Sequence, residues 1–125
     1  MKIEQKFWTK ETDWQDLPGE KLSQKPQLVL VFGARALMED QQYFDQIKSF
    51  YPESHIVECS TAGEILDTQV KDNSISLTAI FFEKTEVKFA KTDITDIDDS
   101  LAAGKRLAGD CFYPRLYPTN FIQHT

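Results

Sequence analysis

The sequence has few of the features that mark exported or membrane-spanning proteins. It contains two cysteines, Cys59 and Cys111, in 125 residues; these are too few for a disulfide framework, and we expect both to be free thiols. No stretch approaches the roughly 18 consecutive apolar residues of a spanning helix. The amino-terminal residues lack the apolar segment of a secretory signal peptide. These absences predict a cytoplasmic protein that does not insert into a membrane.

The sequence also lacks an excess of basic residues. The 14 Lys and Arg residues are outnumbered by 20 Asp and Glu residues, giving a net charge of −6, which opposes binding to a phosphate backbone. Nucleic acid is therefore not an expected partner. Clusters with metal-ligand spacing are missing, so we predict no metal and no cofactor. One run of acids lacks the glycine and distal glutamate of a calcium loop and is interpreted as a polar loop before a helix; it comprises Asp93, Asp96, Asp98 and Asp99.

What remains is the composition of a globular protein, with 41% hydrophobic and 27% charged residues, which argues against disorder. A chain of this length forms one domain or part of one. We expect four segments: an edge strand and connector over 1–26, a βαβ unit over 27–64, a hairpin and helix over 74–110, and an irregular tail over 111–125.

The segment 27–64 carries the clearest pattern. Residues 28–32 form a continuous apolar run, which predicts a strand covered on both faces. Apolar residues at helical spacing, from Leu37 to Tyr51, predict a helix over 37–50 that Pro52 ends. A second strand is expected over 55–59. This order is that of a βαβ unit, in which the carboxyl ends of the two strands meet at one edge of a sheet.

The flanking segments predict further elements. Residues 1–8 alternate as an edge strand does, and Thr12 or Asp13 would cap a short helix over 14–17. A polar connector is expected over 65–73. Alternation over 74–82 and 87–90, with a turn at 83–84, predicts an antiparallel hairpin. A helix is expected over 100–110, and two prolines break the tail after it. The predicted fold class is α/β: a mixed sheet with a βαβ unit, an antiparallel hairpin and helices packed on the sheet.

Polar residues follow both strands of the βαβ unit. Gly33 permits a close approach to the backbone, and Arg35 is placed to hold a carboxylate or phosphate, or to pair with a nearby acid. Thr61 and Glu64 have the spacing of a capping box at a helix start. The same turn, with its exposed amide groups, would also suit an anionic group.

Cys59 raises the alternative of a cysteine- or serine-dependent enzyme with Cys59 or Ser60 as the nucleophile. His55 falls on the same strand face, but four residues of extended chain separate the two by about 13 Å, too far for direct proton transfer. We therefore do not expect a Cys/His catalytic pair and interpret Cys59 as a small buried thiol.

The run from Cys59 to Glu64, together with the Phe32-Gly33 strand exit and residues 72–82, resembles the amino-terminal half of the FIST domain. That family consists of sensory domains found in bacterial signalling proteins and in some F-box proteins. The resemblance implies a non-enzymatic, intracellular role in sensing small molecules such as amino acids, with output through a signalling partner or an attached domain. The ligand-binding residues that it suggests are Gly33, Arg35, Cys59, Ser60, Thr61, Gly63 and Glu64.

The sequence departs from the family pattern at two points. Glu58 stands where the family usually has glycine before the cysteine, which removes backbone freedom at that position. The family's domain also continues well beyond the length of this chain, so we expect a truncated domain. A further alternative is accordingly a self-associating fragment without ligand activity, driven by an exposed sheet edge or by the aromatic tail.

Overall fold

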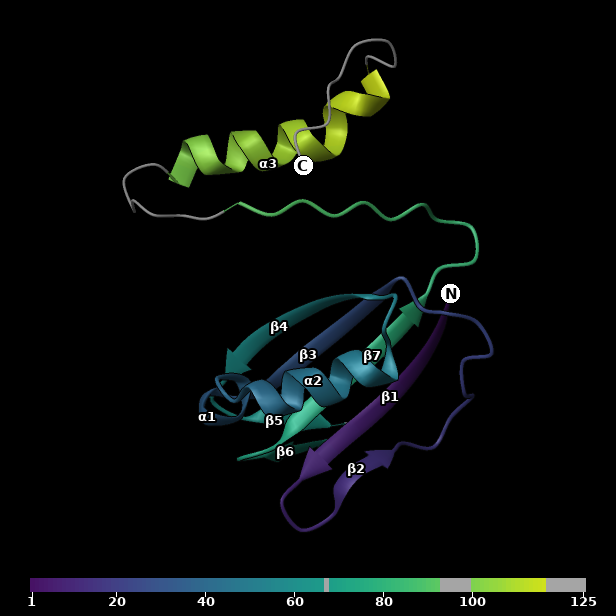
Figure 1. The fold of residues 1–125 in the computed structure, drawn as a ribbon, viewed down its shortest axis with the longest axis vertical. Helices are drawn as coiled ribbons and strands as arrows, with labels where there is room; N and C mark the ends of the chain where they lie inside the picture. Colours follow the sequence, from purple (N-terminus) through teal and green to yellow (C-terminus); the bar gives the residue numbers. More distant parts are fainter. Residues whose placement is uncertain (67, 93–99, 117–125) are drawn as a thin grey trace. The chain divides into compact units, whose positions relative to one another are not determined.

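The computed structural model describes residues 1–66, 68–92 and 100–116. They fall into two compact units, Met1–Glu86 and Val87–Thr125, each of which is described by itself. The first unit holds every strand and two of the helices, and the second holds the remaining helix (Figure 1). All residues proposed from the sequence as a ligand site belong to the first unit.

A five-stranded sheet of order β2-β1-β7-β3-β4 forms the centre of the first unit. Its strands are β1 (Lys2–Thr9), β2 (Asp13–Asp16), β3 (Leu28–Ala34), β4 (His55–Thr61) and β7 (Ile75–Phe81). Two helices, α1 (Arg35–Met38) and α2 (Gln41–Phe50), connect β3 to β4. A separate two-stranded sheet consists of β5 (Glu64–Leu66) and β6 (Gln69–Lys71).

The predicted α/β class and βαβ unit are confirmed. β3 and β4 pair in parallel, with Val29 beside Ile56 and Gly33 beside Ser60, whereas β7 runs antiparallel to both β1 and β3. The sheet is therefore mixed. Antiparallel hairpins are present as β1–β2 and β5–β6, although neither is the hairpin expected over 74–90. Residues 85–92 form no strand, and β7 pairs instead with two strands that are distant in sequence.

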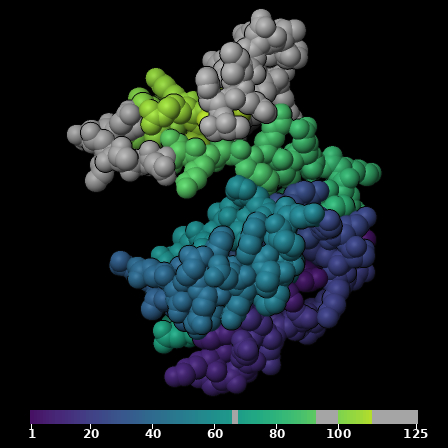
Figure 2. Space-filling view, viewed as in Figure 1, coloured from purple at the N-terminus to yellow at the C-terminus, as the bar shows by residue number. Residues whose placement is uncertain are grey.

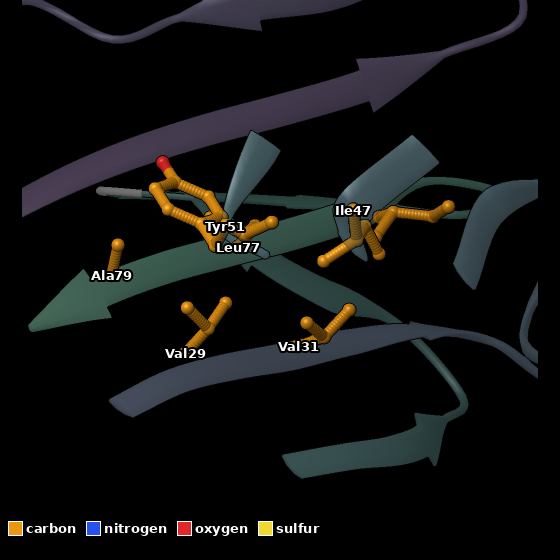
Figure 3. Packing of buried hydrophobic residues seen from close by; sticks show 7 residues of the cluster. Val29, Val31, Ile47, Tyr51, Leu77 and Ala79 are labelled. Atoms are coloured by element: carbon orange, nitrogen blue, oxygen red, sulfur yellow. The ribbon is translucent and has the colours of Figure 1, made fainter. Parts of the chain in front are cut away.

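The hydrophobic core lies between one face of the sheet and α2. Figure 3 shows the side chains on this face of the sheet pointing toward Ile47 and Tyr51. They are Val29 and Val31 of β3 and Leu77 and Ala79 of β7. The helical contribution is Ile47, which is fully buried, and Tyr51 directly after α2 is 7% exposed. In the space-filling view, atoms of the segment that contains α1 and α2 cover much of the sheet (Figure 2).

The opposite face of β3 is not fully covered in this unit. Phe32 points away from α2 and is 42% exposed, so the prediction that both faces of this strand are covered is wrong for Phe32. The apolar run did not reveal this, because a continuously hydrophobic run is typical of a strand covered on both faces, whereas Phe32 remains partly exposed.

The single helix expected over 37–50 is interrupted. Asp40 has an extended backbone and its side chain accepts a hydrogen bond from the Gln42 amide, which caps a new helix at that point. α1 therefore ends at Met38 and α2 starts at Gln41. The break gives the chain a separate short helix directly at the end of β3.

Other predicted elements are corrected by strand pairing. β1 forms as expected but lies between β2 and β7, so it is not the edge strand. Residues 13–16 form β2, a strand rather than a short helix, because they pair with Lys6 to Thr9 of β1. The expected connector over 65–73 contains the β5–β6 hairpin. Long-range and cross-strand hydrogen bonds outweigh the local signals in each case.

In the second unit, α3 (Ser100–Leu116) begins where the sequence predicted a helix. It continues through residues 111–116, which the sequence assigned to an irregular tail, and includes Pro114. The acidic loop over 93–99 and the end of the predicted tail, 117–125, lie outside the described residues.

Candidate functional site

The carboxyl ends of β3 and β4 lie side by side, as the βαβ unit predicts. Gly33 is paired with Ser60 and Ala34 with Thr61, and α1 starts at Arg35, immediately after β3. The candidate residues at these ends are thereby gathered at one edge of the sheet. This is the edge at which ligands bind in open α/β sheets.

Strand alternation nevertheless divides these residues between the two faces of the sheet. Successive side chains of a strand point to opposite faces, and Gly33 lies on the core face with Val29 and Val31. Its pairing partner Ser60 therefore lies on the same face as α2. Cys59 and Thr61 lie on the opposite face, so the seven predicted residues do not line a single pocket.

Gly33 is approached by another side chain of the protein. A Cβ atom at this position would lie 2.6 Å from the terminal methyl carbon of Met38 and 3.3 Å from Ile75. The space that the missing side chain leaves is therefore occupied by Met38 of α1. The predicted close approach exists, but its partner is a methionine.

Arg35 is largely exposed, with 82% of its side chain accessible, and its Nε donates to Glu39 at 2.8 Å. The sequence left open whether this arginine holds a ligand or pairs with a nearby acid, and here it pairs with an acid. Exposed pairs four residues apart on a helix contribute only a few tenths of a kcal/mol. The Arg35–Glu39 pair is thus a weak surface contact.

Thr61 and Glu64 do contact each other, but not at a helix start. The Thr61 hydroxyl donates to Glu64 Oε1 at 2.8 Å, while Glu64 begins the strand β5. The capping-box interpretation is therefore wrong. The three-residue spacing instead closes a tight turn between two strands, which brings the two side chains together as it would at a helix start.

Glu64 makes two further hydrogen bonds to a residue that the sequence analysis did not single out. Ser74, the residue before β7, donates its hydroxyl to Glu64 Oε2 at 2.7 Å and its backbone amide to the same oxygen at 3.2 Å. Both residues are buried. No spacing pattern connects positions 64 and 74, and only the folding back of the β5–β6 hairpin places them together.

Cys59 is exposed, and its thiol lies 3.5 Å from the Ser60 carbonyl oxygen. The prediction of a small buried thiol is therefore wrong. β4 is the last strand of the sheet, and most of its side chains, including His55, are exposed. A strand at the edge of a sheet has fewer neighbours to cover its side chains.

Two other candidate positions have distinct surroundings. Gly63 lies in the turn before β5, where an added Cβ would be 3.0 Å from Val70 and 3.6 Å from the Asp72 carboxyl group. Glu58, on the core face of β4, has a raised pKa because the surrounding protein removes water from its carboxyl group. Glycine at 63 therefore allows the turn to pack against β6, whereas Glu58 places a partly desolvated acid in the middle of β4.

A groove of about 350 Å³ lies away from this edge, between the first half of β1 and the loop over 16–21. Ile3 of β1 is paired through Ile80 with Leu28, the first residue of β3, so the groove is at the amino end of the strands. None of the residues predicted as a ligand site lines this groove.

No group of three or more His, Cys, Asp or Glu side chains is arranged to hold a metal ion in the described part of the chain. Among the same residues, no helix combines the length and apolar character needed to cross a bilayer.

The chain matches the family model of the FIST N domain over residues 27–122. This match covers most of the chain and includes the whole βαβ unit, so the chain belongs to the FIST N domain family. Comparisons with curated proteins and with solved structures each found no match. The protein is thus a sensory domain of signal transduction, as its family is, and the resemblance predicted from the sequence is confirmed.

Proposed function

We propose that this sensory domain binds a small carboxylate, such as an amino acid, at the carboxyl ends of β3 and β4. The observation that carries the proposal is the pair of exposed polar groups on adjacent strand ends. Arg35 is 82% exposed and pairs with Glu39, and Ser60 is exposed on the neighbouring strand. A guanidinium binds a carboxylate through two parallel hydrogen bonds, and the Ser60 hydroxyl near the end of the adjacent strand offers a further donor.

The remaining candidate residues support this site in different ways. Gly33 lets Met38 of α1 pack against β3, which places the helix that carries Arg35. Thr61, Gly63 and Glu64 shape the turn after β4, and Cys59 lies on the face opposite Ser60. We propose that the domain acts without catalysis, in the cytoplasm, and transmits the bound state to a signalling partner or an attached output domain.

The test is a thermal melt of the intact chain with a panel of amino acids and simple carboxylates, including glycine, glutamate, acetate and succinate. A compound at about 100 times its dissociation constant adds about 2.7 kcal/mol of stability and raises the midpoint by on the order of 10 °C. We expect one chemical class to raise the midpoint. A cooperative melt that no compound shifts would contradict the proposal.

Two matched variants locate the site. Arg35→Gln removes the guanidinium and is expected to abolish the shift, whereas Glu39→Gln removes its competing acid and is expected to keep the shift or enlarge it. Both residues are exposed and form one ion pair with each other, so the two variants lose the same contact within the protein. Equal loss of the shift in both variants would place the ligand elsewhere.

The exposure of Cys59 favours a second candidate, an enzyme with a cysteine nucleophile. Alkylation by iodoacetamide at neutral pH, with the modified residue identified by mass spectrometry, separates the two. A sensory domain predicts that Cys59 reacts at the rate of an ordinary exposed thiol. A rate at least about tenfold higher would indicate an activated nucleophile.

A further inference from the structure

The burial of Glu64 distinguishes it from the other candidate residues. It is 1% exposed, and no basic side chain among the described residues forms an ion pair with it. Burying a carboxyl group is costly unless hydrogen bonds compensate it. Three donors do so here, because Oε1 accepts from Thr61 and Oε2 accepts twice from Ser74.

These bonds extend to both strand ends of the candidate site. Thr61 is the last residue of β4. The Ser74 carbonyl oxygen accepts a hydrogen bond from the Ala34 amide at 3.1 Å, and Ala34 is the last residue of β3, directly before Arg35. One continuous path therefore runs from Thr61 through Glu64 and Ser74 to the residue that precedes Arg35.

The same geometry argues against direct contact between Glu64 and a ligand. Both carboxyl oxygens already have donors within the protein, and a side chain that is 1% exposed offers almost no surface. Breaking these bonds to admit a ligand would leave buried hydroxyl and amide groups without partners, which is unfavourable. A ligand at the strand ends is therefore not expected to touch Glu64 itself.

We propose that Glu64 is a positioning residue, which fixes the exits of β3 and β4 relative to each other through Thr61 and Ser74 without contacting the ligand. This role rests on the proposed ligand site at those strand ends. The β5–β6 hairpin contributes to this role, because it reverses the chain direction between Glu64 and Ser74 and so brings these two residues together.

Amide hydrogen exchange of the intact chain, followed by NMR, tests the proposal without any ligand. Glu64→Gln replaces an oxygen acceptor with an amide donor, and Ser74→Ala removes one hydroxyl while keeping the carboxyl group. In both variants we expect the amides of Ala34 and of residue 74 to exchange roughly tenfold faster, because a bond to a charged acceptor is lost. The amides of Val29 and Val31 should be unchanged.

Thr61 supplies a matched pair of variants. Thr61→Val removes the hydroxyl at nearly constant volume, whereas Thr61→Ser keeps it. We expect faster exchange at Ala34 in Thr61→Val and wild-type exchange in Thr61→Ser. A role confined to packing would make the two variants alike, and that result would overturn the proposal.

Two other results would also overturn it. Faster exchange confined to residues 64–71 would mean that Glu64 anchors only the hairpin. A uniform increase over the whole sheet would mean that it contributes only to global stability. Because none of these measurements uses a ligand, their failure is distinct from a melt that no compound shifts.

Discussion

The terminal methyl carbon of Met38 lies 2.6 Å from the position that a Cβ atom on Gly33 would take, and the Met38 sulfur lies 3.1 Å from it. Gly33 is a buried residue near the end of β3, and Met38 ends the short helix that follows. The absence of a side chain at Gly33 thus allows α1 to fold back onto the strand it leaves. The position of Arg35 depends on that packing, because Arg35 begins the same helix.

Gly33→Ala is therefore expected to destabilise the protein by about 1 kcal/mol. Overpacking typically costs about 1–3 kcal/mol, which exceeds the roughly 0.5–1 kcal/mol that alanine gains over glycine within a strand. In a Met38→Ala background the clash with Met38 is gone and only the 3.3 Å contact with Ile75 remains, so the same substitution should cost clearly less. Urea denaturation of the four proteins measures this coupling, and equal effects in the two backgrounds would refute the packing argument.

Two isoleucines provide a matched test of the core. Ile47 is 0% exposed and packs between α2 and the sheet, whereas Ile65 on β5 is 69% exposed. Ile47→Ala should cost about 2–5 kcal/mol, because it leaves a cavity in a closely packed interior. Ile65→Ala removes the same atoms and should change stability by no more than about 0.5 kcal/mol. Chemical denaturation measures the free energy of unfolding of both variants. Similar losses in the two would contradict the placement of Ile47 in the core.

Tyr51 connects the end of α2 to β1. Its hydroxyl donates to Glu4 Oε1 at 2.7 Å, and the other Glu4 oxygen accepts from the Leu22 amide. Burial, together with the Glu4 carboxylate, raises the pKa of Tyr51 well above its ordinary value. Tyr51→Phe should cost about 1–2 kcal/mol at neutral pH, because Glu4 loses a buried partner. A double variant with Glu4→Gln should lose less than the sum of the single losses.

The dependence of stability on pH above about 8 should also reveal the contact between Tyr51 and Glu4. A group whose pKa is raised by folding stabilises the folded state below its unfolded pKa, and this contribution is lost as pH rises past about 10. Thermal melts from pH 8 to 11 should therefore show a steeper loss for the wild type than for Tyr51→Phe. Parallel curves for the two proteins would show that folding does not raise the pKa of Tyr51.

Glu58 also predicts a loss of stability with rising pH, but in the acidic range. Partial desolvation raises the pKa of this carboxyl group above its reference value of 4.5, so its ionised form is disfavoured in the folded protein. The associated stability is present below the unfolded pKa and is lost as pH rises through the folded pKa. Glu58→Gln should therefore stabilise the protein slightly at pH 7, within about 0.5 kcal/mol, and have no effect near pH 3.

The control for Glu58 is Glu39→Gln, which changes an exposed acid paired with Arg35. That variant should be neutral or slightly destabilising at pH 7, because it loses a weak surface pair. Calorimetric melts at both pH values compare the two. If Glu58→Gln were destabilising at pH 7, the carboxylate would have a favourable partner that outweighs its desolvation.

Much of the fold was predictable where one local pattern dominates. The apolar run of β3, the helical spacing up to Tyr51 and the short second strand together define the βαβ unit, and each pattern agrees with the others. The candidate site was predictable in outline for the same reason, since the carboxyl ends of two parallel strands must meet. The polar residues at these ends could also be named from the sequence, because Arg35 directly follows β3 and Ser60 and Thr61 are the last two residues of β4.

The sequence predictions are wrong where the structure of a segment depends on a strand that is distant in sequence. Residues 13–16 are a strand because β1 offers them a free edge, and residues 87–90 are not a strand because β7 pairs with β1 and β3 instead. Cys59 is exposed because β4 is at the edge of the sheet. None of these pairings leaves a signal within the residues concerned.

The sequence by itself determined the βαβ order, the core positions Val29, Val31 and Ile47, and the membership of a sensory family, because hydrophobic periodicity and a short motif are local properties of the chain. Only the tertiary structure decided that Ser60 and Thr61 face opposite sides of the sheet and that Glu64 is buried against Ser74. The reason is physical: burial and hydrogen bonding across ten or more residues depend on how strands pair, and strand pairing is a property of the whole sheet.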